Sequence, residues 1–335
     1  NGIPQAIKDT GYWTGFPTTY GSPLLKDAVA AQDSLMTARM KAAGCIVIGK
    51  TNMPEFGLGS HTFNTLFGAT PNAWDANVSA GGSSGGAAVA LAQRLLPVAD
   101  GSDFMGSLRN PAAWNNIFGM RPSQGRVPFW PASDVWVTQL GSEGPLARSV
   151  ADLTQLLAVQ AGHDARVPLS IDSAFVPLTF DGSTAALKGL RIGWLGDLGG
   201  HLALEPGIAA LCETALQRCE GEGAHVEPLK ATFDANAVWQ AWLVWRRALV
   251  APRIAPLLQR DAAAREQIKP EALWEHDQAQ GTNVMELMRA SEVRSTFLQQ
   301  MLALFEHADV LALPTTQVWP FAISERWPTQ IAGRT

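Results

Sequence analysis

The chain has 335 residues, 47% of them hydrophobic and 16% charged, so it is long enough to bury a substantial core. Its net charge is −5 and no basic stripe is present, which leaves a nucleic-acid partner without electrostatic support. No run approaches the ~18 consecutive apolar residues that a membrane span needs. The cysteines Cys45, Cys212 and Cys219 show no metal-ligand spacing, and we expect reduced, apolar residues of a cytoplasmic protein.

Helical and extended patterns alternate along the chain. Residues 27–44 predict a helix ended by Gly44, and residues 45–49 predict a fully apolar strand of the kind buried in a parallel sheet. The later elements continue the alternation: a helix over 84–94, a strand over 95–98, a helix over 150–162, a strand over 190–195, a helix over 206–223 and a strand over 310–313. This order predicts an α/β fold with a mixed, largely parallel central sheet covered by helices on both faces.

The segment 234–308 differs from the rest because it is long, helical and rich in tryptophan. Trp239, Trp242 and Trp245 recur every third residue, so they share one broad helix face. Two interpretations stay open. The indoles pack against the core, or they line an apolar substrate pocket.

Two serine clusters hold the residues best suited to chemistry, one at 79–86 and one at 101–111. A serine hydroxyl becomes a good nucleophile only when a base removes its proton, and that base is usually histidine. None of the six histidines has a convincing site-like context, and His61, the nearest candidate, is expected to be structural. The spacing around Ser83 also fails the GxSxG elbow. A lysine whose pKa is depressed by burial can replace histidine.

The motif Gly81-Gly82-Ser83-Ser84-Gly85-Gly86, together with Gly106-Ser107-Leu108-Arg109-x-Pro111, resembles the amidase signature family. Ser83 and Ser107 lie 24 positions apart, as in that signature, and Gly2-Ile3-Pro4…Lys8-Asp9 resembles its lysine motif. Further similarity lies at 49–56, 121–127, 144–152 and 308–316.

The resemblance implies an amidase that works through an acyl-enzyme. Ser107 would be the nucleophile, Ser83 would bridge it to Lys8, and neutral Lys8 would be the general base. The peptide bond before Ser83 would be cis. The oxyanion hole would be formed by the backbone N–H groups of Phe104, Met105, Gly106 and Ser107.

One position departs from the family pattern. Met105 stands where the family usually has glycine, so either its φ suits a side chain or the loop has shifted, and we expect a reshaped acyl pocket. Asp103 and Arg109 flank the nucleophile and are expected to form an ion pair that holds its loop. Lys50 and Asp9 are expected to have structural roles.

As a whole, residues 1–335 are expected to form a single amidase signature domain that lacks N- and C-terminal parts. Residues 234–308 would be its helical substrate-pocket subdomain. The expected partner is a small-molecule amide, with no metal, organic cofactor, nucleic acid or membrane, and with a homodimer as the assembly. Two alternatives stay open: a glutaminase A-type subunit of a tRNA-dependent amidotransferase, and an inactive family fragment that serves as a binding module.

Overall fold

The computed structural model describes residues 2–137, 140–179 and 183–335, which divide into two compact units. Unit 1 comprises Asn1–Phe180, Glu266–Lys269 and Pro320–Trp327, and unit 2 comprises Asp181–Arg265, Pro270–Trp319 and Pro328–Thr335. Among the described helices, none combines the length and the apolar character needed to cross a membrane.

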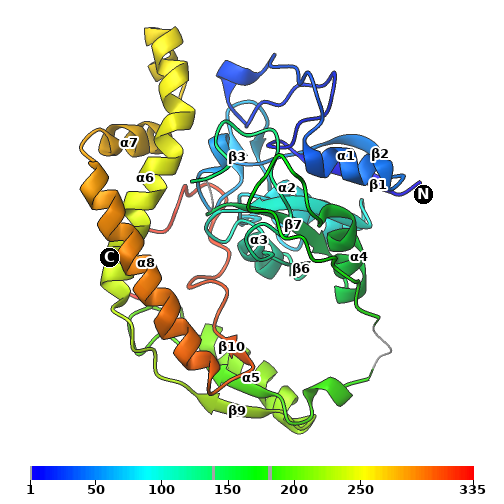
Figure 1. Ribbon diagram of the computed structural model, residues 1–335, viewed down its shortest axis with the longest axis vertical. Helices are drawn as coiled ribbons and strands as arrows, with labels where there is room; N and C mark the ends of the chain where they lie inside the picture. The colour runs from blue at the N-terminus through cyan, green and yellow to red at the C-terminus, as the bar shows by residue number, and fades with distance from the viewer. Residues whose placement is uncertain (1, 138–139, 180–182) are drawn as a thin grey trace. The chain divides into compact units, whose positions relative to one another are not determined.

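Unit 1 is built around two short sheets that contact each other through one strand of each (Figure 1). Strand β1 (Pro4–Lys8) pairs in parallel with β2 (Ile46–Thr51), while β5 (Val98–Asp103) pairs antiparallel with β7 (Ser142–Ala147), which also pairs with β6 (Phe118–Gly119). The Asp100 carboxylate joins the sheets, because it accepts a hydrogen bond from the Lys8 amide at 3.1 Å. This contact fixes the end of β1 beside β5.

Helices cover both faces of these sheets, as the sequence predicts. Successive side chains of a strand point to opposite faces, so neighbouring residues of β1 pack in different hydrophobic cores. Ile7 packs in a core with α1 (Leu35–Ala42) and α4 (Val150–Gln160), whereas Ala6 packs in a second core with α2 (Gly85–Ala92) and α3 (Arg109–Trp114).

Helix α1 is shorter than the sequence pattern indicates. Ser34 caps it by accepting a hydrogen bond from the Thr37 amide at 3.4 Å, so the helix begins at Leu35 and residues 27–34 are irregular. Strand β5 likewise begins at Val98, later than the predicted 95–98 segment. The remaining elements of unit 1 are short: η1 (Pro23–Leu25), η2 (Glu55–Gly57) and the antiparallel pair β3 (Phe63–Asn64) and β4 (Gly68–Ala69).

Two details of the predicted sheet need correction. The mixed α/β class is confirmed, while the parallel pairing is confirmed only in part, because β1 and β2 are parallel but the ladders of β5, β6 and β7 are antiparallel. Strand β2 is not fully buried, because Ile46 and Ile48 are 56% and 59% exposed. Among the described strands, β2 pairs only with β1, which leaves its other edge without a ladder partner.

Unit 2 contains a parallel sheet in the order β10 (Val310–Ala312), β8 (Arg191–Trp194) and β9 (His225–Pro228). Helix α5 (Ile208–Gly221) contacts β9, and η3 (Ala185–Leu187) precedes β8.

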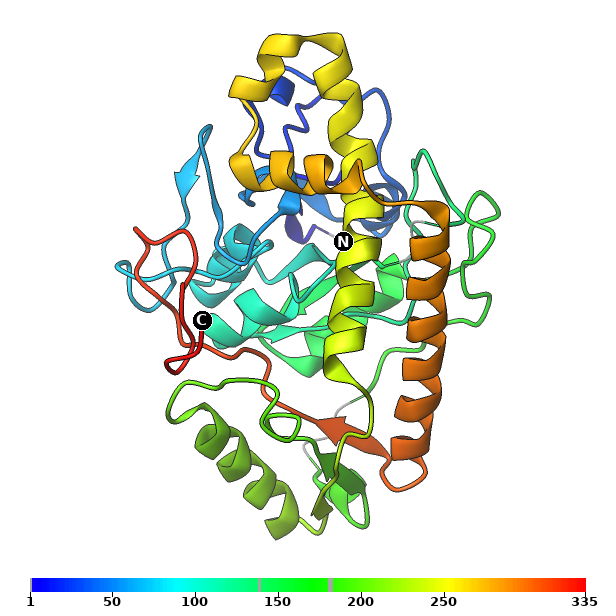
Figure 2. The ribbon, with the colours of Figure 1, turned by 90° about the vertical axis from the view of Figure 1, so that its left-hand side faces the viewer.

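The helical segment expected over 234–308 consists of α6 (Ala235–Arg260), η4 (Ala262–Glu266), α7 (Pro270–Ala279) and α8 (Val284–Phe305). Helices α7 and α8 both pack against α6 (Figure 2). The three regularly spaced tryptophans are not equivalent: Trp245 is buried, whereas Trp239 is 44% exposed.

Candidate active site

The buried end of β1 carries a lysine surrounded by serine hydroxyls. The Nζ atom of Lys8 lies 2.7 Å from Ser83 Oγ, 2.9 Å from Ser84 Oγ and 2.9 Å from Ser102 Oγ. A neutral amine has two N–H donors and one lone pair. Three oxygens suit both states of Lys8: the ammonium can donate to all three, and the neutral amine can donate to two hydroxyls and accept a hydrogen bond from the third.

The acid–base state of Lys8 is unusual. Burial lowers its pKa from 10.5 to about 7, because the charged ammonium loses its water, and the carboxyls of Asp100, Asp103 and Glu143 oppose this shift without cancelling it. A large fraction of the amine is therefore neutral near pH 7, which a general base requires.

The first serine cluster is held by hydrogen bonds to its backbone. The carbonyl oxygen of Gly81 accepts bonds from the amide and hydroxyl of Thr62 at 3.1 and 2.8 Å. The Gly82 amide donates to Asn110 Oδ1 at 3.1 Å, and the Gly82–Ser83 peptide bond is cis. The position of Ser83 is thus set by residues from two other segments.

His61 supports this loop from behind. Its ring contacts Ser79 Oγ through Nδ1 at 2.7 Å and the carbonyl oxygen of Ile323 through Nε2 at 3.0 Å. Ser79 Oγ in turn accepts a bond from the Gly81 amide at 3.0 Å. Burial lowers the pKa of His61, so a neutral ring that donates from Nε2 to the Ile323 carbonyl is favoured. His61 therefore has the structural position that the sequence indicates.

The second serine cluster runs from the end of β5 into the start of α3. Its Asp103 carboxylate accepts bonds from the amides of Gly106 and Leu108 at 2.7 and 3.1 Å, on either side of Ser107. The carbonyl oxygen of Ser107 accepts a bond from the Ser84 amide at 3.2 Å. Ser107 is therefore held beside the first cluster by its own backbone.

The predicted ion pair between Asp103 and Arg109 is confirmed, with Nε and Nη2 of Arg109 each 3.0 Å from a carboxylate oxygen. Arg121 adds a second cation at 3.3 Å. Burial would raise the pKa of Asp103, but the hydrogen bonds and charge of Arg109 and the two loop amides outweigh it and lower this pKa to about 2. Asp103 thus holds the loop as an anion.

The backbone at Met105 is compatible with a side chain. Met105 lies outside the left-handed region, whereas Gly106 has φ +99°, which a side chain rarely adopts. The φ of Met105 therefore suits a side chain, and the reshaped acyl pocket stays a prediction. The Met105 side chain is 46% exposed.

Asp9 and Lys50 also have structural contacts. The Asp9 carboxylate accepts hydrogen bonds from the Thr19 amide at 3.1 Å and the Thr19 hydroxyl, and it forms an ion pair with Lys50 at 3.5 Å. Lys50 Nζ also donates to the Gly11 carbonyl and to Thr18 Oγ1. Burial lowers the pKa of Lys50, while Asp9 opposes this shift.

Three residues around Lys8 were not identified from the sequence: Ser102, Asp100 and Glu143. Asp100 and Ser102 could have been found from the strand pattern. Every second side chain of a strand points to the same face, so both lie on one face of β5, next to the nucleophile loop. Glu143 carried no comparable signal, because its place opposite Ser102 depends on a register between strands far apart in sequence.

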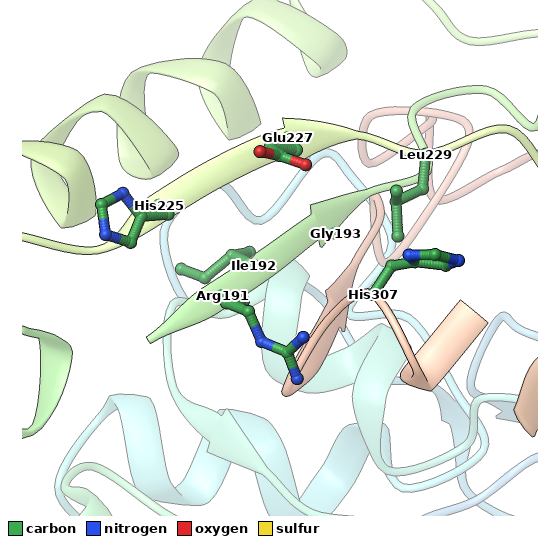
Figure 3. A pocket seen from close by; sticks show the side chains of 7 residues that line it. All are labelled: Arg191, Ile192, Gly193, His225, Glu227, Leu229 and His307. Carbon is green, nitrogen blue, oxygen red and sulfur yellow. The ribbon is translucent and has the colours of Figure 1, made fainter. Parts of the chain in front are cut away.

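Two hollows are lined by residues other than these serines. One, of about 480 Å³ on unit 1, is lined in part by Trp13, Phe16 and Ile48. The other, on unit 2, measures about 50 Å³, and its two imidazoles, His225 and His307, lie at opposite ends (Figure 3). Neither lining includes Ser83 or Ser107. Within the described ranges, no group of three His, Cys, Asp or Glu side chains is arranged to hold a metal ion.

An α/β fold with a buried lysine among serine hydroxyls defines a class of candidate serine hydrolases, and comparison with known proteins gives the family. The Amidase family model matches residues 1–332, and the chain belongs to this family. The A-type subunit of the glutamyl-tRNA(Gln) amidotransferase from Acidothermus cellulolyticus is 32% identical over 97% of this chain and 68% of its own length. Its counterpart from Mycolicibacterium vanbaalenii is 39% identical over 72% of this chain, and the match spans about half of that relative, 49%.

Solved structures show the same fold. A bacterial aryl acylamidase of the amidase signature family aligns with a TM-score of 0.89 and 30% identity, over 99% of this chain and 70% of that one. A 6-aminohexanoate cyclic dimer hydrolase aligns with a TM-score of 0.84 and 26% identity, over 96% and 69% of the two chains. The A-type subunit of the Thermotoga maritima glutamyl-tRNA(Gln) amidotransferase gives a TM-score of 0.81 and 26% identity, over 96% and 70%.

Proposed function

We propose that this protein is an amidase that hydrolyses a small carboxylic amide through an acyl-enzyme on Ser107. The observation that carries the proposal is the contact of Lys8 Nζ with Ser83 Oγ at 2.7 Å, made by a lysine whose pKa is lowered to about 7. A lysine in this state accepts a proton near neutral pH. The backbone bond between Ser84 and Ser107 supports the placement of the nucleophile beside this pair.

In the acylation step, the Ser107 oxygen attacks the amide carbonyl carbon while its proton passes to Ser83 and the Ser83 proton passes to Lys8. The carbonyl electron pair moves to oxygen, and its return breaks the carbon–nitrogen bond. The leaving nitrogen takes its proton from Lys8 through Ser83. Water then attacks the ester, its proton follows the same route, and the carboxylic acid leaves as Ser107 regains its hydroxyl proton.

We assign stabilisation of the developing oxyanion to the nucleophile loop, residues 104–107. The proposed donors are the backbone amides of Phe104, Met105, Gly106 and Ser107, and the Gly106 amide also donates to Asp103 at 2.7 Å, which holds the loop. Gly106 would contribute its positive φ, which sets the turn before the nucleophile. Each such donor typically contributes ~3 kcal/mol to the transition state.

The proposed substrate is a bulky apolar amide. Phe104 and the half-exposed Met105 lie on the nucleophile loop, and the bacterial aryl acylamidase has the same fold over 99% of this chain. A second candidate is glutaminase activity as part of an amidotransferase, which the 32% identity to the A-type amidotransferase protein of Acidothermus cellulolyticus favours. The homodimer and the cytoplasmic location remain predictions from the sequence.

The test is turnover of aryl, aliphatic and amino-acid amides, glutamine included, by the wild type and by Ser107→Ala and Lys8→Ala. Both variants should lose amide turnover and labelling by a fluorophosphonate while they stay folded. Ser295→Ala and Lys41→Ala are the matched controls, because both residues lie on exposed helix faces. Near-normal turnover by Ser107→Ala would contradict the mechanism, and turnover of glutamine alone would favour the second candidate.

A further inference from the structure

A second ionisable group faces Lys8 from the neighbouring sheet. Glu143 on β7 pairs with Ser102 on β5, and residues directly opposite each other in a ladder project to the same face. Ser102 Oγ contacts Lys8 Nζ at 2.9 Å, so the Glu143 carboxyl lies on the face that holds the lysine amine. Glu143 is only 4% exposed.

The two carboxyls near Lys8 have different surroundings. Burial raises the pKa of Asp100, but hydrogen bonds from the Lys8 backbone amide and the Gln5 amide group, both at 3.1 Å, oppose this shift and stabilise its anion. In contrast, Oε2 of Glu143 is buried and has no hydrogen-bond partner among the described residues. A buried carboxylate needs hydrogen bonds to compensate for its lost water, so the negative charge belongs on Asp100 and the proton on Glu143.

We propose that Glu143 is a positioning residue that holds a proton beside Lys8 in the resting protein and, by staying uncharged, keeps the lysine amine available as a base. The catalytic consequence rests on the proposed amidase function, whereas the proton on Glu143 does not. An ionised Glu143 at this place would stabilise the Lys8 ammonium and withhold the base.

The charges around Glu143 support this assignment. Burial, and then the charge of Asp100, raise the pKa of Glu143 to about 8, while Lys8 opposes the shift. The groups that face it are Lys8 from β1 and Asp100 from β5; Asp103 at the end of β5 is paired with Arg109 and Arg121. Of the packed helices, α2 carries no titratable side chain and α4 carries only the exposed Asp152.

The two sites titrate as a coupled pair. The first proton leaves either Lys8 or Glu143, and loss from Glu143 leaves an anion that retains the proton on Lys8. The activity of the wild type should therefore rise with pH in two steps, one for each ionisation of the pair. In Glu143→Gln, which has the shape of the neutral acid, the rise should follow one ionisation and lie at lower pH.

The deciding experiment measures unfolding by urea between pH 5 and 9 for the wild type, Glu143→Gln and the control Glu213→Gln, whose residue is exposed on α5. The folded pKa of Glu143 is above its unfolded value, so its stabilising contribution is present at low pH and is lost as pH rises through about 8. The ratio of the wild-type equilibrium constant for unfolding to that of Glu143→Gln should therefore increase with pH. The increase should be up to about tenfold per pH unit below pH 8. The control should show no comparable change with pH.

A ratio of unfolding constants that is flat from pH 5 to 8 would overturn the proposal. Failure of both Glu143→Gln and Glu143→Leu to fold at pH 6, where the wild type folds, would overturn it too, because both mimic an uncharged side chain. This titration needs no turnover. Loss of the proposed amidase function would appear as an inactive wild type, while a pH-dependent ratio would still support the proton on Glu143.

Discussion

The Ser84 amide donates a hydrogen bond to the carbonyl oxygen of Ser107 at 3.2 Å, so backbone joins the two serine clusters. Ser83 precedes the donor of this bond, and Ser107 carries its acceptor. The separation of the two proposed catalytic hydroxyls is therefore limited by main-chain geometry, with side-chain rotation as the remaining freedom. Such preorganisation favours proton transfer along a fixed path.

The first prediction concerns pH. The pKa of Lys8 is lowered to about 7, and only the neutral amine accepts a proton, so kcat/KM should rise as pH increases through this region. The measurement is kcat/KM, or the rate of fluorophosphonate labelling, from pH 5 to 9. A profile that is flat over this range, with a stable enzyme, would show that Lys8 is not the base.

The second prediction concerns Ser102, which accepts from the Lys8 amine at 2.9 Å. Ser102→Ala removes one contact that orients the lone pair of Lys8 towards Ser83. The loss of one hydrogen bond costs ~1 kcal/mol, so kcat should fall roughly fivefold. KM should change little, because the hydroxyl faces the lysine. Ser295→Ala, on an exposed helix face, provides the control for serine replacement.

The sequence predicted the helices and the loop residues better than the sheet. The motifs around Ser83 and Ser107 are local, and so is the ion pair of Asp103 with Arg109, which are six residues apart. The surroundings of Lys8 depend on strand order and register instead. Asp100 reaches β1 across a gap of 92 residues, and no local pattern fixes such a contact.

The third prediction concerns stability in acid. The pKa of Asp103 is lowered to about 2, so its contribution to the free energy of unfolding is present above pH 4 and is lost as pH falls through about 2. Asp103→Asn should lower this free energy by about 2–3 kcal/mol at pH 7, since Arg109 and the loop amides lose a charged acceptor.

Urea unfolding at pH 7 and at pH 2–4 tests this effect. The difference between the wild type and Asp103→Asn should shrink in acid. The control is Asp234→Asn, because Asp234 caps α6 through two backbone bonds and asparagine is an equally good cap. An equal loss in both variants would contradict the role assigned to Asp103.

The fourth prediction uses two glycines in helices. A Cβ at Gly86 in α2 would lie 2.5 Å from the amide nitrogen of Asn52 and 2.8 Å from its carbonyl oxygen, whereas a Cβ at Gly221 in α5 meets nothing within 4 Å. Gly86→Ala should therefore cost about 1–3 kcal/mol by overpacking, since backbone cannot move aside cheaply. Gly221→Ala should be neutral or slightly stabilising. Thermal unfolding of both variants is the measurement.

The last prediction concerns specificity at Met105. Its backbone lies outside the left-handed region and its side chain is 46% exposed, so Met105→Gly should keep the fold. Glycine removes apolar surface next to the proposed nucleophile, which should weaken bulky amides more than small ones. One lost apolar contact is worth ~1–3 kcal/mol, so the ratio of kcat/KM for an aryl amide to that for a short aliphatic amide should fall at least about fivefold. Met105→Leu, similar in volume, should retain the ratio. An unchanged ratio in Met105→Gly would place the selective contacts outside this loop.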